Sequence, residues 1–160
     1  MKEFLDFARN LIGLMAILWI LLGFVIGIEM MPNDDMRPGT RAGDILIYSR
    51  MDRVPDISDI LVIKKNDMVY IGRVAATGGD KVEITNDSIL MVNDNTVTEE
   101  NIRQTPRYEG FLDYPLVLDD RECFVLSDRR EGGEDSRFYG PVSYDEILGT
   151  VIGQYRRGST

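Results

Sequence analysis

The stretch DILVIKKNDMVYI, residues 59–71, decides the fold class of this chain. Two apolar, β-branched runs, 59–63 and 68–71, flank the pair Asn66-Asp67. Asn and Asp are common in the tight turns that join two antiparallel strands. This pattern therefore predicts a β-hairpin.

Similar runs continue on both sides of this hairpin. Each is short, apolar and bounded by Gly, Asn or Asp, which is typical of strands in an antiparallel sheet protein. The sequence predicts a mainly β domain, a barrel or a sandwich, with further strands at 44–48, 82–84, 89–92, 96–98, 122–126 and 147–155.

Residues 99–121 interrupt this pattern because they are polar and contain Pro106, Gly110 and Pro115. Three aromatic residues lie close together in the segment. Two readings stay open: a surface excursion pinned to the core by its aromatics, or a loop that binds a partner. The three aromatics are Tyr108, Phe111 and Tyr114.

The amino-terminal part of the chain predicts a membrane span. Residues 11–28 are 18 consecutive positions without a charge, about the number that crosses the hydrocarbon core of a bilayer. The sequence that follows, 29–32, offers no Ala-x-Ala site, so an uncleaved anchor is favoured over a removed signal peptide. Lys2 and Arg9 precede the span, and the positive-inside rule then places residues 1–10 in the cytoplasm and 29–160 outside.

Composition excludes several classes of protein. The net charge of −9 argues against binding nucleic acid, which requires a basic surface. The chain has no histidine, so Ser-His-Asp catalysis and His-ligated zinc are excluded. The single cysteine, Cys123, is predicted to be a buried core residue. No cofactor and no metal site are expected.

Four segments, taken in order along the chain, resemble the type I signal peptidases. The most specific is Asp135-Ser136-Arg137 followed by Gly140 and Val142. The resemblance implies a membrane-anchored antiparallel β domain and a structural role for Asp128, Arg130, Asp135, Ser136 and Arg137. The four segments are 32–40, 43–47, 72–74 with 79–82, and 127–130 with 135–142.

Two departures from the family pattern concern its catalytic dyad. Where the resemblance implies the serine nucleophile and the lysine base, this chain has Asp35 and Gly72. The serine must attack the scissile carbonyl and a neutral lysine must take its proton. Gly72 has no side chain that could take a proton, and the Asp35 carboxylate is a poor nucleophile toward an amide. The resemblance therefore implies a protein that does not cleave.

Other polar positions of the family site also differ here. Asn33 aligns with a serine that helps to stabilise the oxyanion, and Gly133-Glu134 align with a further serine. A carboxylate pair of Asp34 and Asp35 is disfavoured, because neighbouring side chains of an extended segment point to opposite faces. A metal site from Asp34, Asp35 and Glu134 is not favoured either, since their spacing matches no known loop.

In the family, a groove takes an extended peptide as an added strand, and such a groove can outlast the dyad. We expect the groove to involve Asn33, Asp34, Asp35, Met36, Gly72, Gly133 and Glu134. The paired Asp and Gly further resemble the inactive SipA accessory proteins of streptococcal pilus loci. That resemblance implies a chaperone-like role in pilus assembly, with pilin subunits or a pilus sortase as partners. Two alternatives stay open: an active peptidase that uses carboxylate chemistry, and a purely structural membrane subunit.

Overall fold

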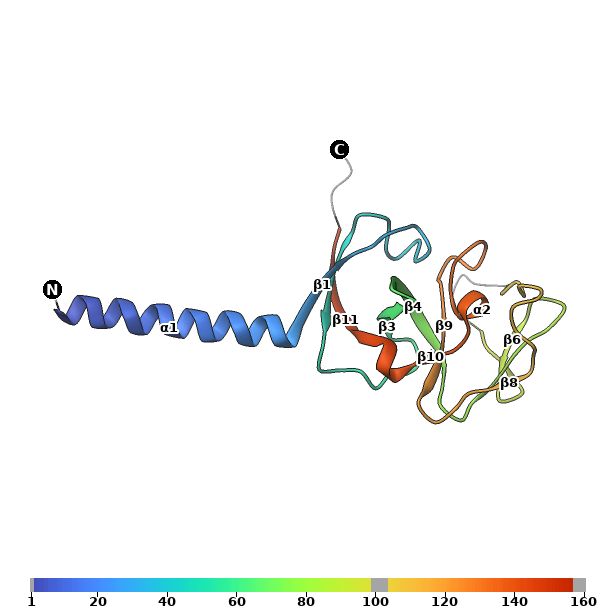
Figure 1. Ribbon diagram of the computed structural model, residues 1–160. Coiled ribbons are helices and arrows are strands. Elements are labelled where there is room, and N and C mark those ends of the chain that lie inside the picture. The colour runs from blue at the N-terminus through green and yellow to red at the C-terminus, as the bar shows by residue number, and fades with distance from the viewer. Residues whose placement is uncertain (1, 99–103, 157–160) are drawn as a thin grey trace.

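The computed structural model describes residues 2–98 and 104–156. Within these ranges the chain forms one long N-terminal helix and two antiparallel sheets, one of seven strands and one of four (Figure 1). The predicted fold class, a mainly β domain preceded by an apolar helix, is confirmed.

Helix α1 covers Lys2–Val25 and buries none of its side chains. It is long and apolar enough to cross a membrane and points away from the sheets (Figure 1). The apolar run of 11–28 does not stay helical to its end, however. Its last residues belong to strand β1, Ile26–Met30, which pairs with β2, Ile45–Ser49.

The large sheet has the order β1-β2-β11-β3-β4-β9-β10. Its centre is the predicted hairpin, formed by β3, Ile60–Lys65, and β4, Met68–Thr77. Asn66 and Asp67 in its turn have φ angles of 51° and 61°, which are typical of a tight hairpin turn. The remaining strands are β9, Glu122–Leu126, β10, Val142–Ser143, and β11, Ile147–Tyr155.

The small sheet has the order β7-β6-β5-β8. It contains the predicted pair β5, Lys81–Ile84, and β6, Leu90–Val92. The short strands β7, Asn95–Thr96, and β8, Leu116–Val117, complete its edges. Two short helical segments follow β9: α2, Ser136–Tyr139, and the 3₁₀ turn η1, Tyr144–Glu146.

Strand β9 connects the cores of the two sheets because its side chains alternate in direction. Cys123 and Val125 pack with the large sheet, whereas Phe124 and Leu126 pack with side chains of the small sheet. Cys123 is fully buried and unpaired, as predicted. The loop that leaves β9 therefore starts where the two cores meet, and this loop carries the candidate site.

Candidate functional site

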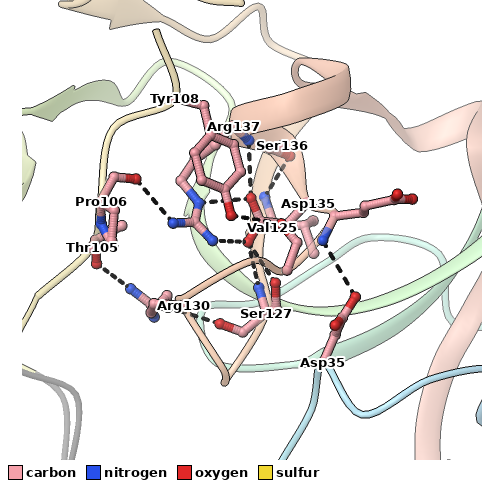
Figure 2. A network of polar contacts seen from close by, with 12 residues as sticks. Asp35, Thr105, Pro106, Tyr108, Val125, Ser127, Arg130, Asp135, Ser136 and Arg137 are labelled. Carbon is pink, nitrogen blue, oxygen red and sulfur yellow. Dashed lines mark hydrogen bonds and ion pairs between the residues drawn. The ribbon is translucent and has the colours of Figure 1, made fainter.

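The loop after β9 is organised by a buried ion pair between Asp135 and Arg137. Arg137 Nε donates to Asp135 Oδ1 at 2.8 Å and Nη2 donates to Oδ2 at 2.7 Å. Figure 2 shows these contacts between the two side chains. Both side chains are almost completely buried. This two-pronged geometry is the strongest form of side-chain ion pair. It raises the pKa of the Arg137 guanidinium against the opposing effect of burial.

Two serines tie this ion pair to β9. Ser127 donates to Asp135 Oδ2 through its hydroxyl at 2.6 Å and through its backbone N–H at 2.9 Å. Ser136 Oγ accepts from the backbone N–H of Val125 at 2.9 Å. Asp135 also caps α2 by accepting from the N–H of Arg137. Asp135, Ser136 and Arg137 thus form a hydrogen-bonded scaffold between the end of β9 and α2.

The same scaffold holds the described part of the 99–121 segment. Arg137 Nη1 donates to the carbonyl of Pro106 at 3.0 Å, and the guanidinium stacks 4.4 Å above the ring of Tyr108. Arg130 Nη1 donates to Thr105 Oγ1 at 2.6 Å. Residues 105–108 are therefore held against this loop, and Leu112, Tyr114 and Leu116 pack on the core of the small sheet. These contacts agree with the first of the two readings, an excursion held to the core. Residues 99–103 lie outside the described part of the chain.

Asp35 lies beside this scaffold and connects two distant segments (Figure 2). Its Oδ2 accepts from Asn33 Nδ2 at 2.9 Å and from the backbone N–H of Glu134 at 3.3 Å. Its carbonyl accepts from the N–H of Arg129 at 2.7 Å. The side chain is only 8% exposed. The loop before β2 is thus fastened to the loop after β9 through Asp35.

The backbone N–H of Asp35 is also engaged, because it donates to Asn33 Oδ1 at 3.1 Å. Asn33 therefore uses both ends of its amide on Asp35. The family resemblance aligns Asn33 with a serine that helps to stabilise the oxyanion. In this structure its amide instead donates to Asp35, so the two residues form a closed local pair.

Asp34 and Asp35 face different surroundings, as predicted, although the physical reason differs. The segment 33–40 consists of turns and is not extended. Asp34 Oδ1 accepts from the backbone N–H of Ala42 at 3.0 Å and pairs with Arg37 at 2.9 Å. The Ala42 N–H is the main reason why the pKa of Asp34 lies below its ordinary value of 3.8.

Two other residues assigned to the candidate groove have structural surroundings. Met36 is fully buried in the core with Leu46 and Tyr48. Gly133 packs so closely on Ser127 that a side chain there would overlap the serine hydroxyl. The carbonyl of Gly133 accepts from Tyr108 Oη at 3.0 Å. Of the predicted groove residues on this loop, Glu134 is the exposed one.

Gly72 lies in the middle of β4 and pairs with Leu61 of β3. A Cβ atom at this position would lie 2.6 Å from Val125 Cγ1 and 3.2 Å from the carbonyl oxygen of Leu126. Real Cβ atoms do not approach so closely. The space that a longer side chain would need to enter is therefore already occupied by β9.

The neighbour of Gly72, Arg73, holds the loop after β9 in place. Its Nε and Nη2 donate to the two carboxylate oxygens of Asp128, each at 2.8 Å. Asp128 precedes Arg129, whose N–H binds Asp35. A chain of polar contacts thus runs from β4 through this loop to the segment of Asp35.

Sequence reasoning missed some residues that shape the site. The sequence indicates only that Val125 belongs to a strand, yet its methyl group occupies the space beside Gly72. Thr105 and Pro106 were seen only as loop residues, although they receive hydrogen bonds from Arg130 and Arg137. No local pattern could have found these contacts, because each joins residues at least 25 positions apart.

The family profile described as "Signal peptidase, peptidase S26" matches residues 4–155. Signal peptidase I of Bacillus caldolyticus is 32% identical over 153 residues, covering 82% of this chain and 80% of that protein. The probable thylakoidal processing peptidase 2 of Arabidopsis thaliana is 30% identical, covering 79% of this chain. The chain spans only 37% and 41% of the length of the two Arabidopsis processing peptidases it matches.

Two more distant proteins complete the comparison. The inactive signal peptidase IA of Staphylococcus aureus is 22% identical, covering 97% of this chain and 93% of that protein. A crystal structure of signal peptidase I from Enterococcus faecalis has a TM-score of 0.48 and 23% identity, covering 60% of this chain.

Proposed function

This chain belongs to the signal peptidase family, peptidase S26, and from that premise we propose that it is a membrane-anchored member that does not cleave. We further propose that α1 crosses the membrane, with Lys2 and Arg9 on the cytoplasmic side and the β domain outside. The domain would act there as an accessory factor that binds a secreted polypeptide.

The geometry at Gly72 is the observation that carries the proposal. A Ser-Lys mechanism needs an amine beside the nucleophile. At the position that aligns with the lysine there is no side chain, and Val125 fills the adjacent space. Substituting lysine at Gly72 alone would place its Cβ 2.6 Å from the Val125 methyl group. Both the residue type at position 72 and the packing of β4 against β9 therefore prevent a lysine base at this position.

The contacts of Asp35 argue against carboxylate chemistry. An aspartic dyad needs two facing carboxylates that share one proton. The Asp35 carboxylate instead accepts from the amide of Asn33 and from the N–H of Glu134. Its sequence neighbour Asp34 is bound to Ala42 and Arg37. These contacts fit an anchoring role for Asp35. The name of one relative, the inactive signal peptidase IA of Staphylococcus aureus, supports the proposal that the chain does not cleave.

The identity of the bound polypeptide is proposed from the resemblance to the SipA proteins alone. On that basis we propose pilin subunits or a pilus sortase as partners, and a chaperone-like role in assembling cell-surface pili. In the described structure, Glu134 is exposed on the loop anchored by Asp35 and is the natural point for such a contact.

The cleavage test uses the full chain, reconstituted in vesicles with a membrane-anchored preprotein. Signal peptidase I of Bacillus caldolyticus serves as the positive control. We expect no cleaved product from the unaltered chain and complete processing by the control. Cleavage by the unaltered chain, lost in Asp35→Ala, would overturn the proposal in favour of an active carboxylate enzyme.

The partner test places a photoreactive residue at Glu134 in cells that produce a pilin. The matched control carries the same residue at Val117, which is 63% exposed in the other sheet. We expect cross-linking to the pilin or the sortase from position 134 and none from 117. Equal cross-linking from both positions, or none from either, would contradict binding at this loop.

A further inference from the structure

Two phenylalanines form an exposed aromatic pair on the side chains that surround the buried scaffold. Phe111 comes from the described part of the 99–121 segment and Phe138 from α2, and their ring centroids lie 4.9 Å apart. The two residues are 52% and 42% exposed. Two rings in contact gain most when both leave water, and aromatic residues are enriched where proteins bind partners. The pair is therefore a candidate contact surface.

The backbone directs Phe111 away from the core. Leu112 and Tyr114 pack on the core of the small sheet, whereas Phe111 and Asp113, which alternate with them, are exposed. The turn before them contains Gly110, whose φ angle of 80° favours glycine. The exposure of Phe111 thus follows from the path of a chain that is itself held in place.

The aromatic pair stands on the scaffold of the candidate site. Tyr108, three positions before Phe111, donates to the carbonyl of Gly133 at 3.0 Å. Arg137, the neighbour of Phe138, stacks on the ring of Tyr108 (Figure 2). Both phenylalanines are therefore attached to one buried network. An apolar anchor that is already fixed loses little conformational entropy when a partner binds.

The exposed charges next to the aromatic pair are negative. The cation within 131–138, Arg137, is buried and bound to Asp135. Arg129, the exposed cation before this range, acts on Asp34 and helps to lower its pKa. In the ranges 109–113 and 131–138, every exposed charged side chain is a carboxylate: Glu109, Asp113, Glu131 and Glu134. We call these four carboxylates together with Phe111 and Phe138 the aromatic–acidic surface.

We propose that the aromatic–acidic surface binds a polypeptide segment that carries Lys or Arg beside an apolar side chain. This inference rests on the proposed function and deepens it, because it names the chemistry of the segment that the accessory domain holds. The apolar side chain packs on the two rings, and the cation meets the carboxylates and the face of a ring. The chain uses the same kind of contact internally, where Arg137 stacks 4.4 Å above the ring of Tyr108.

Charge and position favour a basic polypeptide over other occupants. A second copy of the chain has a net charge of −9 and brings the same carboxylates, so two copies repel each other. Anionic lipid headgroups are repelled for the same reason. Figure 1 shows α2 at the end of the domain that is far from α1, so the aromatic pair does not lie beside the apolar helix.

The test measures the binding of labelled peptides to the full chain in nanodiscs of zwitterionic lipid. Fluorescence anisotropy reports binding, and empty nanodiscs are the blank. Three peptides of equal length share a Ser-Gly background. The first carries Leu and Lys, the second has Glu in place of every Lys, and the third has Ser in place of every Leu. We expect the first peptide to bind most tightly, because it alone offers both the apolar side chain and the cation.

Substitutions at the aromatic pair test the site itself. Phe111→Ser should weaken binding of the Leu-Lys peptide about tenfold, because truncated aromatic anchors cause the largest losses at an interface. Phe111→Tyr keeps the ring and should retain binding. The control Val54→Ser truncates a residue that is 70% exposed in a loop before β3 and should leave binding unchanged.

Substitutions of the carboxylates test the charge argument. Glu109→Gln with Glu134→Gln should weaken binding of the Leu-Lys peptide about threefold at low salt and reduce its salt dependence. The matched control, Asp56→Asn with Asp87→Asn, removes two exposed acids from other loops and should have no such effect.

Four outcomes overturn this inference. If Phe111→Ser binds the Leu-Lys peptide as tightly as the unaltered chain, the chain binds polypeptides but not at this surface. If the Glu peptide binds equally well, the charge argument is wrong. If no peptide binds, the surface does not take cationic segments, and the cross-linking from Glu134 decides separately whether the accessory function holds. Self-association of the detergent-solubilised chain that Phe111→Ser abolishes would assign the surface to a second copy.

Discussion

Asp135 and Asp35 are two buried aspartates in neighbouring loops, yet they have different partners. Asp135 meets the guanidinium of Arg137 and the hydroxyl of Ser127. Asp35 accepts from the amide of Asn33 and the backbone N–H of Glu134. The first carboxylate is half of a buried ion pair that holds the scaffold. The second fastens a loop. It shows that the fold of a peptidase can be kept while residues at its former active site make structural contacts instead.

The largest effect is expected from breaking the ion pair. Arg137→Ala leaves the Asp135 carboxylate buried without its cation, which costs about 3–5 kcal/mol. Urea unfolding of the detergent-solubilised chain measures this loss of stability. The circular dichroism of the tyrosines monitors unfolding of the β domain, because all 7 tyrosines lie outside α1. Asp135→Ala with Arg137→Ala should cost less than the sum of the single variants. If the two losses of stability were simply additive, Asp135 and Arg137 would not be coupled.

Asp35→Ala should have the next largest effect. It removes the acceptor for Asn33 and Glu134, and the loss of these hydrogen bonds to a charged group should cost about 1.5–3 kcal/mol in total. Asp35→Asn keeps one acceptor oxygen and should lose less stability. The same urea experiment distinguishes the variants. If alanine at Asp35 is as stable as the unaltered chain, Asp35 does not fasten the two loops together.

Gly72→Ala tests the other half of the lost dyad. The added methyl group meets Val125, and overpacking by one methyl group should cost about 1–2 kcal/mol. Val125→Ala should relieve most of this strain in the double variant. Gly153→Ala is the control, because a Cβ there has no neighbour within 4 Å. Equal stability of the Gly72 and Gly153 variants would show that the space beside Gly72 is not filled.

The smallest effect is expected at Asp34, the half-buried neighbour of Asp35. Its folded pKa lies below 3.8, mainly because of the Ala42 N–H. A lowered pKa gives stability that is present above about pH 3.8 and is lost as the pH falls through the folded value. The stability difference between the unaltered chain and Asp34→Ala should therefore shrink below pH 3.8. A difference that grows on acidification would refute the assigned contact.

Much of the fold could be predicted because strands and turns have local signals. The hairpin around Asn66-Asp67 was correct, and strands β9 and β11 have the predicted bounds 122–126 and 147–155. Strand β1 was missed because its residues continue an apolar run. Hydropathy alone does not show whether an apolar residue contacts lipid or a neighbouring strand. Gly27, a residue type common in membrane helices, lies in β1 beneath the ring of Tyr48.

The site was predicted less completely. The family resemblance implied only a structural role for Asp135 and Arg137, and the structure shows that the two side chains form a buried ion pair. The contacts of Met36 and Gly133 were not foreseen, because both had been assigned to a binding groove. The structure instead buries Met36 in the core and packs Gly133 on Ser127.

The sequence by itself determined which chemical groups this protein has: no histidine, an acid at position 35, a glycine at 72 and an apolar N-terminal run. Only the tertiary structure decided what those groups contact. Asp35 meets the N–H of Glu134 across 99 positions of the chain, and Val125 occupies the space beside Gly72. The residue types are local properties, whereas these distances result from packing two sheets around β9.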